Sequence, residues 1–127
     1  MGRFINGDVV VVPFPFSDLS ESKRRPALVL VDLAGNDLIL CQITSQTISD
    51  EMAVSIDHAD FESGGLSLVS NVRPNKLFTA DEGIVLYKAG RLNSDKINEI
   101  INRVTDMFKG DSNTTEAQDK LLNDIAP

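Results

Sequence analysis

Arginines and hydroxyl-bearing residues stand at the ends of apolar segments in separate parts of the sequence. Arg24 and Arg25 precede one run of valine and leucine, and Thr44 and Ser45 follow another; residues 73–76 add an arginine, an asparagine and a lysine. Two guanidinium groups and two hydroxyls can bind a phosphodiester through paired hydrogen bonds and stabilise the charge of a pentacoordinate transition state. From residue types alone, the same arginines are more simply explained as solvated charges at the start of a strand, because charged clusters are common on protein surfaces.

RNA is the phosphodiester that demands the fewest catalytic groups, because its own 2′-hydroxyl can attack the adjacent phosphate. A ribonuclease built from a few polar side chains and no metal is therefore chemically possible. The sequence has no glycine-rich phosphate loop, no His-Glu-x-x-His motif and no nucleophile elbow. From the residues alone, a ribonuclease is one option among several.

Metal and thiol chemistry have little support in the sequence. The one histidine, His58, lies among three carboxylates in residues 57–63, but the spacing matches no dedicated metal site. A solvated acidic connection, with a helical turn closed by glycines at 64 and 65, is the expected structure. The single cysteine, Cys41, excludes an internal disulfide, and its apolar neighbours predict a buried, unreactive thiol. We therefore expect no metal and no cofactor.

Length and charge set further limits. The 127 residues predict one domain. The net charge of −7 argues against a general nucleic-acid binder, but two basic clusters, at residues 23–25 and 73–76, could still form a local anion site. No apolar run reaches the ~18 residues of a membrane span, and one cysteine fits a reduced, cytoplasmic location.

The hydrophobic patterns predict six short strands followed by one clear helix, which is typical of a small β-barrel or a strongly bent sheet with a helical cap. The strands are expected from residue 8 to the prolines at 13 and 15, and at 23–31, 38–44, 52–56, 66–73 with a resumption at 77–79, and 83–88. The helix is expected to begin after Ser94 as N-cap and to end at Gly110. Its apolar stripe comprises Ile97, Ile100, Ile101, Val104 and Phe108. Residues 1–110 thus form the folded domain, and residues 111–127 form an acidic tail that could contain a short second helix.

Five motifs occur in order along the chain: Gly7-Asp8-Val9-Val10, Arg25-Pro26-Ala27-Leu28-Val29-Leu30, Gln42-Ile43-Thr44-Ser45, Gly64-Gly65-Leu66 and Ser70-Asn71-Val72-Arg73-Pro74-Asn75-Lys76-Leu77. With these motifs the chain resembles the MazF/PemK-like toxins of bacterial toxin–antitoxin systems, from about residue 7 to residue 109. The resemblance implies a mainly β fold, an SH3-like small β-barrel with capping helices, that acts as a homodimer. It also implies a sequence-specific, metal-independent endoribonuclease that cleaves single-stranded RNA and is neutralised by a cognate antitoxin.

The resemblance assigns catalytic roles to three residues. Arg25 matches the family's catalytic arginine, Thr44 its active-site hydroxyl, and Arg73 a second arginine that the PemK-like branch uses for catalysis or RNA contact. The residues around them are expected to bind RNA: Phe16, Lys23, Arg24, Ser45, Asn75 and Lys76. The polar loop at residues 15–23 is expected to be mobile and to lie over the groove, where an acidic antitoxin segment would dock.

One residue departs from the family pattern. In the PemK-like branch an aspartate, proposed as general base, stands two positions after the second arginine; here that position is Asn75, which cannot accept a proton near neutral pH. Either another group takes the proton, or the attack relies on Arg25 and Thr44, as in the MazF-like branch. A catalytically weak barrel that binds RNA or protein, and a plain interaction module, are the alternatives.

Overall fold

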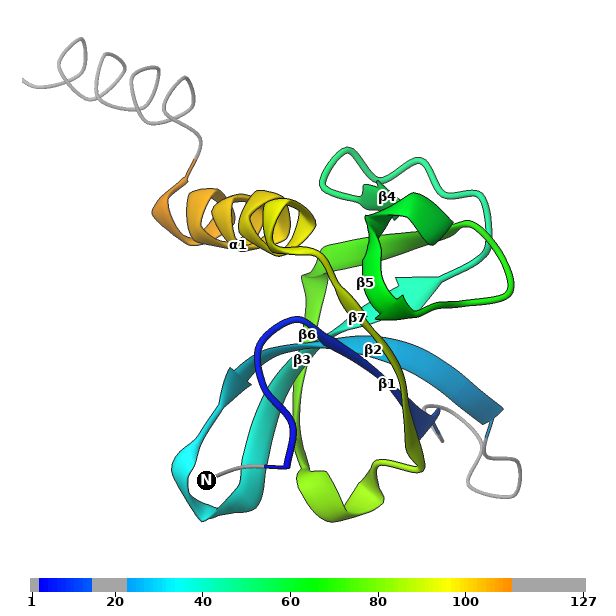
Figure 1. Cartoon of the computed structure of the whole chain (residues 1–127). Helices are drawn as coiled ribbons and strands as arrows, with labels where there is room; N and C mark the ends of the chain where they lie inside the picture. The colour runs from blue at the N-terminus through cyan, green and yellow to red at the C-terminus, as the bar shows by residue number, and fades with distance from the viewer. Residues whose placement is uncertain (1–2, 15–22, 111–127) are drawn as a thin grey trace, which may run out of the picture.

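The computed structural model describes residues 3–14 and 23–110, which form one strongly curled antiparallel sheet and a C-terminal helix (Figure 1). The strands, in the spatial order β4-β6-β3-β2-β1-β7-β5, curl into a half-barrel. Their bounds are β1 (Asp8–Phe14), β2 (Lys23–Asp32), β3 (Asp37–Thr44), β4 (Val54–Ile56), β5 (Phe61–Gly64), β6 (Ser70–Asp81) and β7 (Tyr87–Leu92). The prediction of a mainly β, single-domain fold is confirmed. The predicted loop from residue 15 and the acidic tail lie outside the described residues, except for Lys23.

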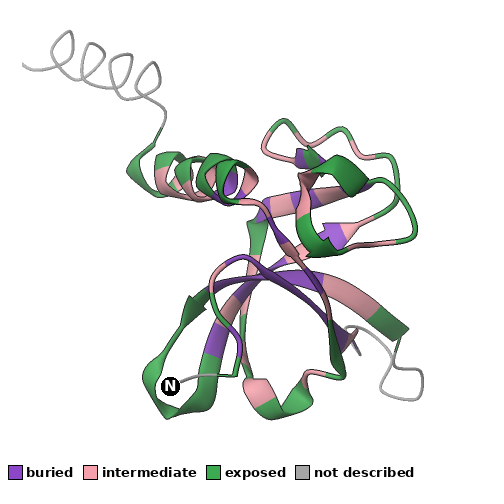
Figure 2. Ribbon diagram, in the orientation of Figure 1, coloured by how far each residue is buried: buried purple, intermediate pink, exposed green. Residues whose placement is uncertain are grey.

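Strand β1 is central, and its four consecutive valines are buried because both faces of the curled sheet are covered (Figure 2). One face contributes Val9 to a core cluster that also contains Leu28, Leu30, Cys41, Ile43, Val54, Ile56, Val72, Leu92, Ile97 and Ile100. The other face contributes Val10 and Val12 to a second cluster with Phe4, Phe14, Ala27, Val29, Leu38 and Leu40. The two clusters fix the curvature of the strands that carry the candidate site.

The Gly7-Asp8 motif joins the first strand to the last. Gly7 has a positive φ of 98°, and a side chain there would collide with Ile97 of the helix. The buried carboxylate of Asp8 accepts a hydrogen bond from the Ile5 amide (2.9 Å) and pairs with Lys88 Nζ (3.1 Å) and Arg91 Nη1 (3.2 Å). The motif is therefore explained by the fold.

Helix α1 (Ser94–Lys109) packs over one end of the sheet through the predicted stripe. Ile97 and Ile100 are buried, whereas Phe108 is exposed. The N-cap is Asn93, one residue before the predicted Ser94, because the Asn93 side chain accepts a hydrogen bond from the Lys96 amide (2.9 Å). Neither α1 nor any other helix in the described part of the chain has the length and apolar character to cross a membrane.

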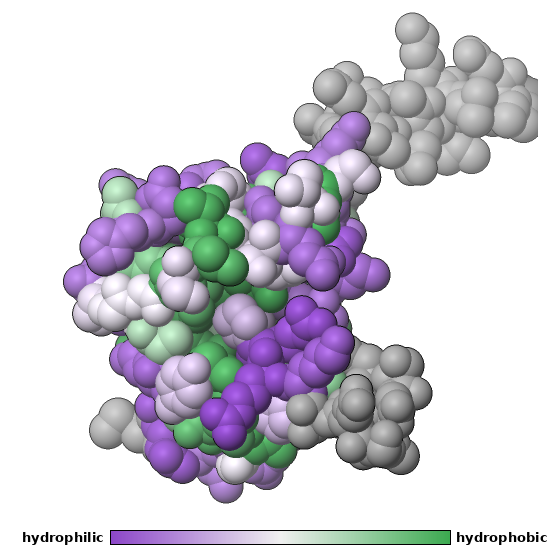
Figure 3. Space-filling view, turned by 90° about the vertical axis from the view of Figure 1, so that its right-hand side faces the viewer, coloured by the Kyte–Doolittle hydropathy of each residue, from purple (hydrophilic) through white to green (hydrophobic). Residues whose placement is uncertain are grey.

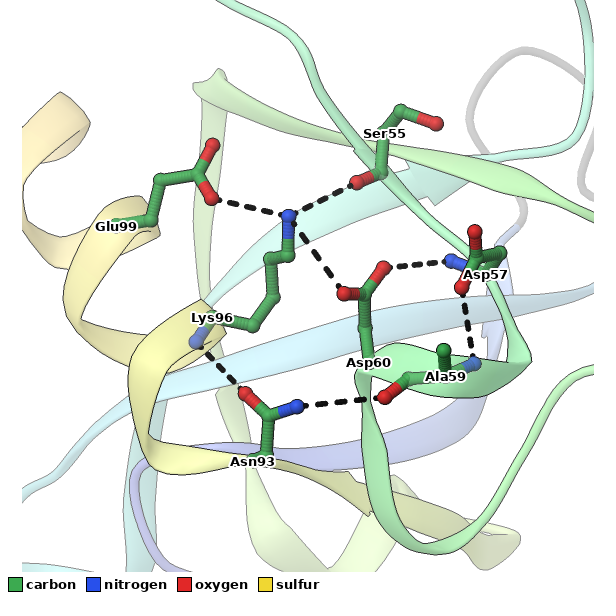
Figure 4. A network of polar contacts seen from close by, with 7 residues as sticks. All are labelled: Ser55, Asp57, Ala59, Asp60, Asn93, Lys96 and Glu99. Carbon is green, nitrogen blue, oxygen red and sulfur yellow. Dashed lines mark hydrogen bonds and ion pairs between the residues drawn. The ribbon is translucent and has the colours of Figure 1, made fainter.

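The acidic segment around His58 is part of a network of polar contacts that connects a short turn to helix α1 (Figure 4). Asp57 and Asp60 form a capping box around a short 3-10 helix, η2 (His58–Asp60). Asp60 also lies 3.7 Å from Lys96 Nζ, which in turn donates to the backbone oxygen of Ser55 (3.4 Å). The two carboxylates that flank His58 in the sequence thus stabilise the turn and attach it to α1.

Two prolines that predicted strand ends or interruptions lie inside strands. Pro13 belongs to β1, and it is tolerated because β7 pairs with β1 only as far as Val11. Pro74 belongs to β6, which is continuous over 12 residues. The pairing of β6 with β3 jumps from Arg73 to Leu77, so Pro74 lies in a bulge where no ladder hydrogen bond is required.

Other predicted boundaries were wrong where a local capping contact or a contact between distant residues decides the backbone. The expected strand at 83–88 starts with the 3-10 helix η3 (Glu82–Ile84), because the Asp81 side chain accepts a hydrogen bond from the Gly83 amide. Strand β7 then runs through Gly90, where any side chain would collide with the Ser63 carbonyl oxygen. Residues 61–63, expected to belong to a helical turn that ends at Gly64, lie in strand β5 (Phe61–Gly64), and the expected strand at 66–73 begins only at Ser70.

Candidate functional site

The strand register brings the three predicted catalytic residues to one face of the sheet. Gln42 of β3 pairs with Ala27 of β2 on one side and with Arg73 of β6 on the other. Paired residues share a face, as do residues two apart along a strand. Arg25 is two residues before Ala27, and Thr44 is two residues after Gln42. Both therefore lie on the same face of the sheet as Arg73.

These residues surround a pocket of about 190 Å³. The residues that line it are Phe14, Arg25, Gln42, Ile43, Thr44, Gln46 and Arg73. Strands β1, β2, β3 and β6 all contribute, so residues from four segments converge on one hollow. The ring of Phe14 is held by an edge-on contact with Phe78, at 4.9 Å between ring centres.

A second pocket, of about 250 Å³, shares Arg25, Ile43 and Thr44 with the first. It extends to Arg24 and Ser45, and its remaining lining residues are Val11, Pro26, Leu66, Ser67, Leu68, Ser70 and Tyr87. Arg25 and Thr44 thus lie where the two pockets adjoin, and we refer to the two pockets together as the groove. Figure 3 views the side of the molecule on which β2 begins, and it shows hydrophobic and strongly hydrophilic side chains adjoining on this face.

The groove is positively charged although the protein is acidic. The described residues that line the two pockets include three arginines and no aspartate, glutamate or histidine. Within the described part of the chain, Arg24 and Arg25 have no ion pair, so no described carboxylate neutralises their charges. Arg73 has a single pairing, at 3.5 Å from Nη2 to Asp50 Oδ2. Such a groove attracts an anion such as a phosphodiester.

Thr44 is oriented by the turn that follows it. Its Oγ1 accepts a hydrogen bond from the Gln46 amide (3.2 Å), and the Gln46 carbonyl accepts one from the Asn71 side chain (3.4 Å). A hydroxyl that accepts in this way still has its own hydrogen to donate. Thr44 can therefore donate a hydrogen bond to an anion in the groove.

The predicted RNA-binding residues are placed differently from one another. Arg24 and Ser45 line the second pocket. Lys23 is exposed at the start of β2 and lines neither pocket. Asn75 and Lys76 are exposed in the β6 bulge and also line neither pocket. Phe16 lies outside the described residues.

Sequence reasoning missed several residues that line the groove, among them Phe14, Gln42, Gln46 and Tyr87. The sequence pattern could have indicated Gln42, because this polar residue interrupts an apolar run and shares a strand face with Thr44. The sequence offered no signal for Tyr87, because only the fold places β7 beside β1, whose other edge pairs with the first half of β2.

Cys41 takes no part in the groove chemistry. It is buried in the core cluster beneath the helix, and burial raises the pKa of its thiol to about 12. The predicted burial of Cys41 is confirmed, and a thiol that stays protonated at neutral pH is a poor nucleophile.

Comparison with solved structures supports this fold. The MazE–MazF complex from Deinococcus radiodurans (Form-III) superposes with a TM-score of 0.67 at 19% identity, over 84% of this chain and 96% of that one. The Mycobacterium tuberculosis toxin MazF-mt6 gives 0.64 at 18%, over 82% and 98%. An endoribonuclease in complex with its cognate antitoxin, from Mycobacterial species, gives 0.60 at 16%, over 82% and 91%.

No curated protein sequence is significantly similar to the chain. The family model for the PemK-like, MazF-like toxin of type II toxin–antitoxin systems, however, matches residues 5–108, a range that contains every described strand and all but the last residue of the helix. Together with the half-barrel, this match shows that the chain belongs to the PemK-like, MazF-like toxin family of type II toxin–antitoxin systems.

Proposed function

We propose that this protein is a sequence-specific, metal-independent endoribonuclease toxin that cleaves single-stranded RNA and is neutralised by a cognate antitoxin. The observation that carries the proposal is the convergence of Arg25, Thr44 and Arg73 on a pocket whose described lining contains no acidic side chain. Family membership and a related Mycobacterial endoribonuclease of the same fold support it.

The proposed chemistry uses the substrate's own nucleophile. The 2′-hydroxyl attacks the adjacent phosphorus, the bond to the 5′-oxygen breaks, and a 2′,3′-cyclic phosphate remains. Arg25 and Arg73 stabilise the negative charge that develops on the phosphate oxygens, and Thr44 donates a hydrogen bond to the same group. The departing 5′-oxygen takes up a proton from one of the arginines or from water and leaves as a 5′-hydroxyl.

The attacking 2′-hydroxyl must lose its proton to an acceptor. Asn75 does not contribute to the described walls of the pockets, and an amide cannot act as a base in any case. No described side chain lining the two pockets is a carboxylate or an imidazole. We therefore favour an attack that depends on electrostatic stabilisation by Arg25 and a hydrogen bond from Thr44, with the proton passing to water.

The ligand chemistry of the described residues supports the proposed metal independence. Among the described residues, no three side chains of the His, Cys, Asp or Glu type gather closely enough to hold a metal ion. Positive charge at the groove is supplied by guanidinium groups, which can stabilise a phosphate in place of a cation.

We further propose two protein partners. An antitoxin with an acidic segment would occupy the positive groove and exclude RNA, and the relatives crystallised as MazE–MazF complexes make such a partner plausible. A second copy of the chain would cover exposed apolar side chains near the rim of the second pocket: Leu68 and Tyr87, which line that pocket, and their sequence neighbours Val69 and Leu86. Both partners fit a cytoplasmic protein that acts on messenger RNA.

The proposal is tested by incubating the purified protein with a long single-stranded RNA and, separately, with DNA of the same sequence. Cleavage of the RNA at a limited set of sites, with the DNA left intact, is expected because DNA has no 2′-hydroxyl. Cleavage of both polymers would contradict the proposed chemistry, and cleavage of neither would contradict the proposed activity.

A second candidate function is a barrel that binds RNA without cutting it. The observation that favours it is Asn75 at the position where the PemK-like branch has an aspartate. RNA binding in a gel-shift assay without any cleavage would establish this alternative.

A further inference from the structure

Asp50 is an acidic residue that contacts Arg73 of the groove without lining either pocket itself. It lies in the connection between β3 and β4, and its side chain is 11% exposed. Its Oδ2 lies 3.5 Å from Nη2 of Arg73, and its Oδ1 accepts a hydrogen bond from the Met52 amide (2.9 Å). Arg73 lines the first pocket, whereas Asp50 is absent from the described residues that line it.

Asp50 is the one polar partner of the Arg73 side chain in the described part of the chain. The Arg73 side chain is 23% exposed, and its Nε is buried without a hydrogen-bond partner. A guanidinium with a long, flexible stem loses rotamer entropy when it is fixed in one place. The carboxylate of Asp50, itself anchored to the backbone at Met52, offsets this cost and restricts where the guanidinium can lie.

The same contacts argue against Asp50 as the missing general base. Both of its carboxylate oxygens are engaged, one by Met52 and one by Arg73. A base must approach the 2′-hydroxyl directly or through one water molecule, which requires an oxygen that faces the pocket. Asp50 is placed to act on Arg73 rather than on the substrate.

We propose that Asp50 is a positioning residue that holds Arg73 in the orientation needed at the scissile phosphate. This inference rests on the proposed ribonuclease activity. It predicts that loss of the Asp50 charge lowers kcat, because the guanidinium no longer meets the transition state correctly. KM should stay the same or fall, since removing a negative charge near the groove does not weaken the binding of a polyanion.

The experiment compares Asp50→Asn with the neighbouring Glu51→Gln in the full-length protein. Asparagine keeps the acceptor for the Met52 amide but presents no charge to Arg73. Glu51 is exposed and its substitution changes the net charge equally, so it controls for a general electrostatic effect. We expect Asp50→Asn to lower kcat by about 10- to 100-fold, in the range that a misplaced group costs, and Glu51→Gln to leave kcat unchanged.

A double-mutant cycle separates positioning from simple destabilisation. If Asp50 acts through Arg73, Asp50→Asn should have no further effect on kcat in an Arg73→Ala background. Asp50→Glu, which keeps the charge, should retain part of the wild-type kcat. A kcat that rises in Asp50→Asn, or a penalty that persists without Arg73, would overturn the proposal.

The side-chain Nε–H signal of Arg73 in ¹⁵N NMR spectra gives a readout that does not depend on activity. It is assigned by its loss in Arg73→Lys, and because Nε is buried its hydrogen should exchange with solvent more slowly than that of Arg24. Asp50→Asn should accelerate this exchange, and Glu51→Gln should not. An unchanged exchange rate in Asp50→Asn would refute the positioning role, whereas a wild-type protein that cleaves no RNA would refute the proposed function and leave this comparison valid.

Discussion

Replacing Arg25 by alanine is expected to lower RNA cleavage by about 10²- to 10³-fold, the usual cost of losing one donor that stabilises a developing anion. The position of Arg25 in the groove is the reason for expecting this large loss of cleavage. It lies where the two pockets meet, it is half-buried, and within the described residues it has no ion pair that would weaken its attraction for phosphate. In free-energy terms, this loss raises the activation barrier by about 2.7–4 kcal/mol.

The same placement predicts a small effect on stability. Arg25 is bonded to no other described side chain, and substitutions away from packed or hydrogen-bonded features usually change the free energy of unfolding by less than about 0.5 kcal/mol. Arg25→Lys keeps the charge but loses the two-pronged geometry, so its cleavage rate should lie between those of alanine and wild type.

The assay measures initial cleavage rates on one RNA, with a thermal unfolding curve for each variant. Lys109→Ala is the matched control, because it removes one positive charge from the exposed end of α1, away from the groove. Arg25→Ala cleaving at the wild-type rate would refute the reasoning. So would a loss of cleavage that is matched by an equal loss of folded protein.

Four other outcomes are expected. Thr44→Ala should abolish most cleavage, measured as the initial rate on the same RNA, while unfolding at the wild-type temperature; normal cleavage by this variant would exclude the hydroxyl from the mechanism. Ile100→Ala should lower the free energy of unfolding in urea by about 2–5 kcal/mol, because Ile100 is fully buried between the helix and the sheet; a smaller loss would mean that the helix contributes little to the core. Light scattering should give about 28 kDa, twice the mass of one chain, and a value near 14 kDa at micromolar concentration would argue against a homodimer. An acidic antitoxin peptide should compete with a non-cleavable RNA, more weakly at high salt, and charge reversal at Arg24 or Arg73 should weaken both ligands; an RNA affinity unchanged by saturating peptide would rule out a shared groove.

The parts of the fold that depend on local sequence could be predicted. The continuous apolar runs of β1 and β2 and the periodic apolar stripe of α1 are local patterns, and they identified these elements to within a few residues. The same holds for Cys41, whose burial follows from its neighbours. Membership of the toxin family was predicted from short motifs and is confirmed.

The remaining parts depend on residues far apart in the chain. Strand β7 passes through Gly90 because the β5 backbone approaches it closely, and β6 continues past Pro74 because β3 supplies partners on both sides of the bulge. The contact between Asp50 and Arg73 spans 23 positions, and no periodic pattern indicates it. The assigned roles of Arg25, Thr44 and Arg73 remain predictions; what the fold adds is their common pocket.

The most direct test of the central claim is to identify the ends of the RNA fragments produced in the presence of excess EDTA. Attack by the 2′-hydroxyl, assisted only by side chains of the groove, predicts undiminished cleavage that leaves a 2′,3′-cyclic phosphate or 3′-phosphate on one fragment and a 5′-hydroxyl on the other. Cleavage that stops with the chelator and returns with Mg²⁺, or fragments that carry 5′-phosphates, would contradict the account.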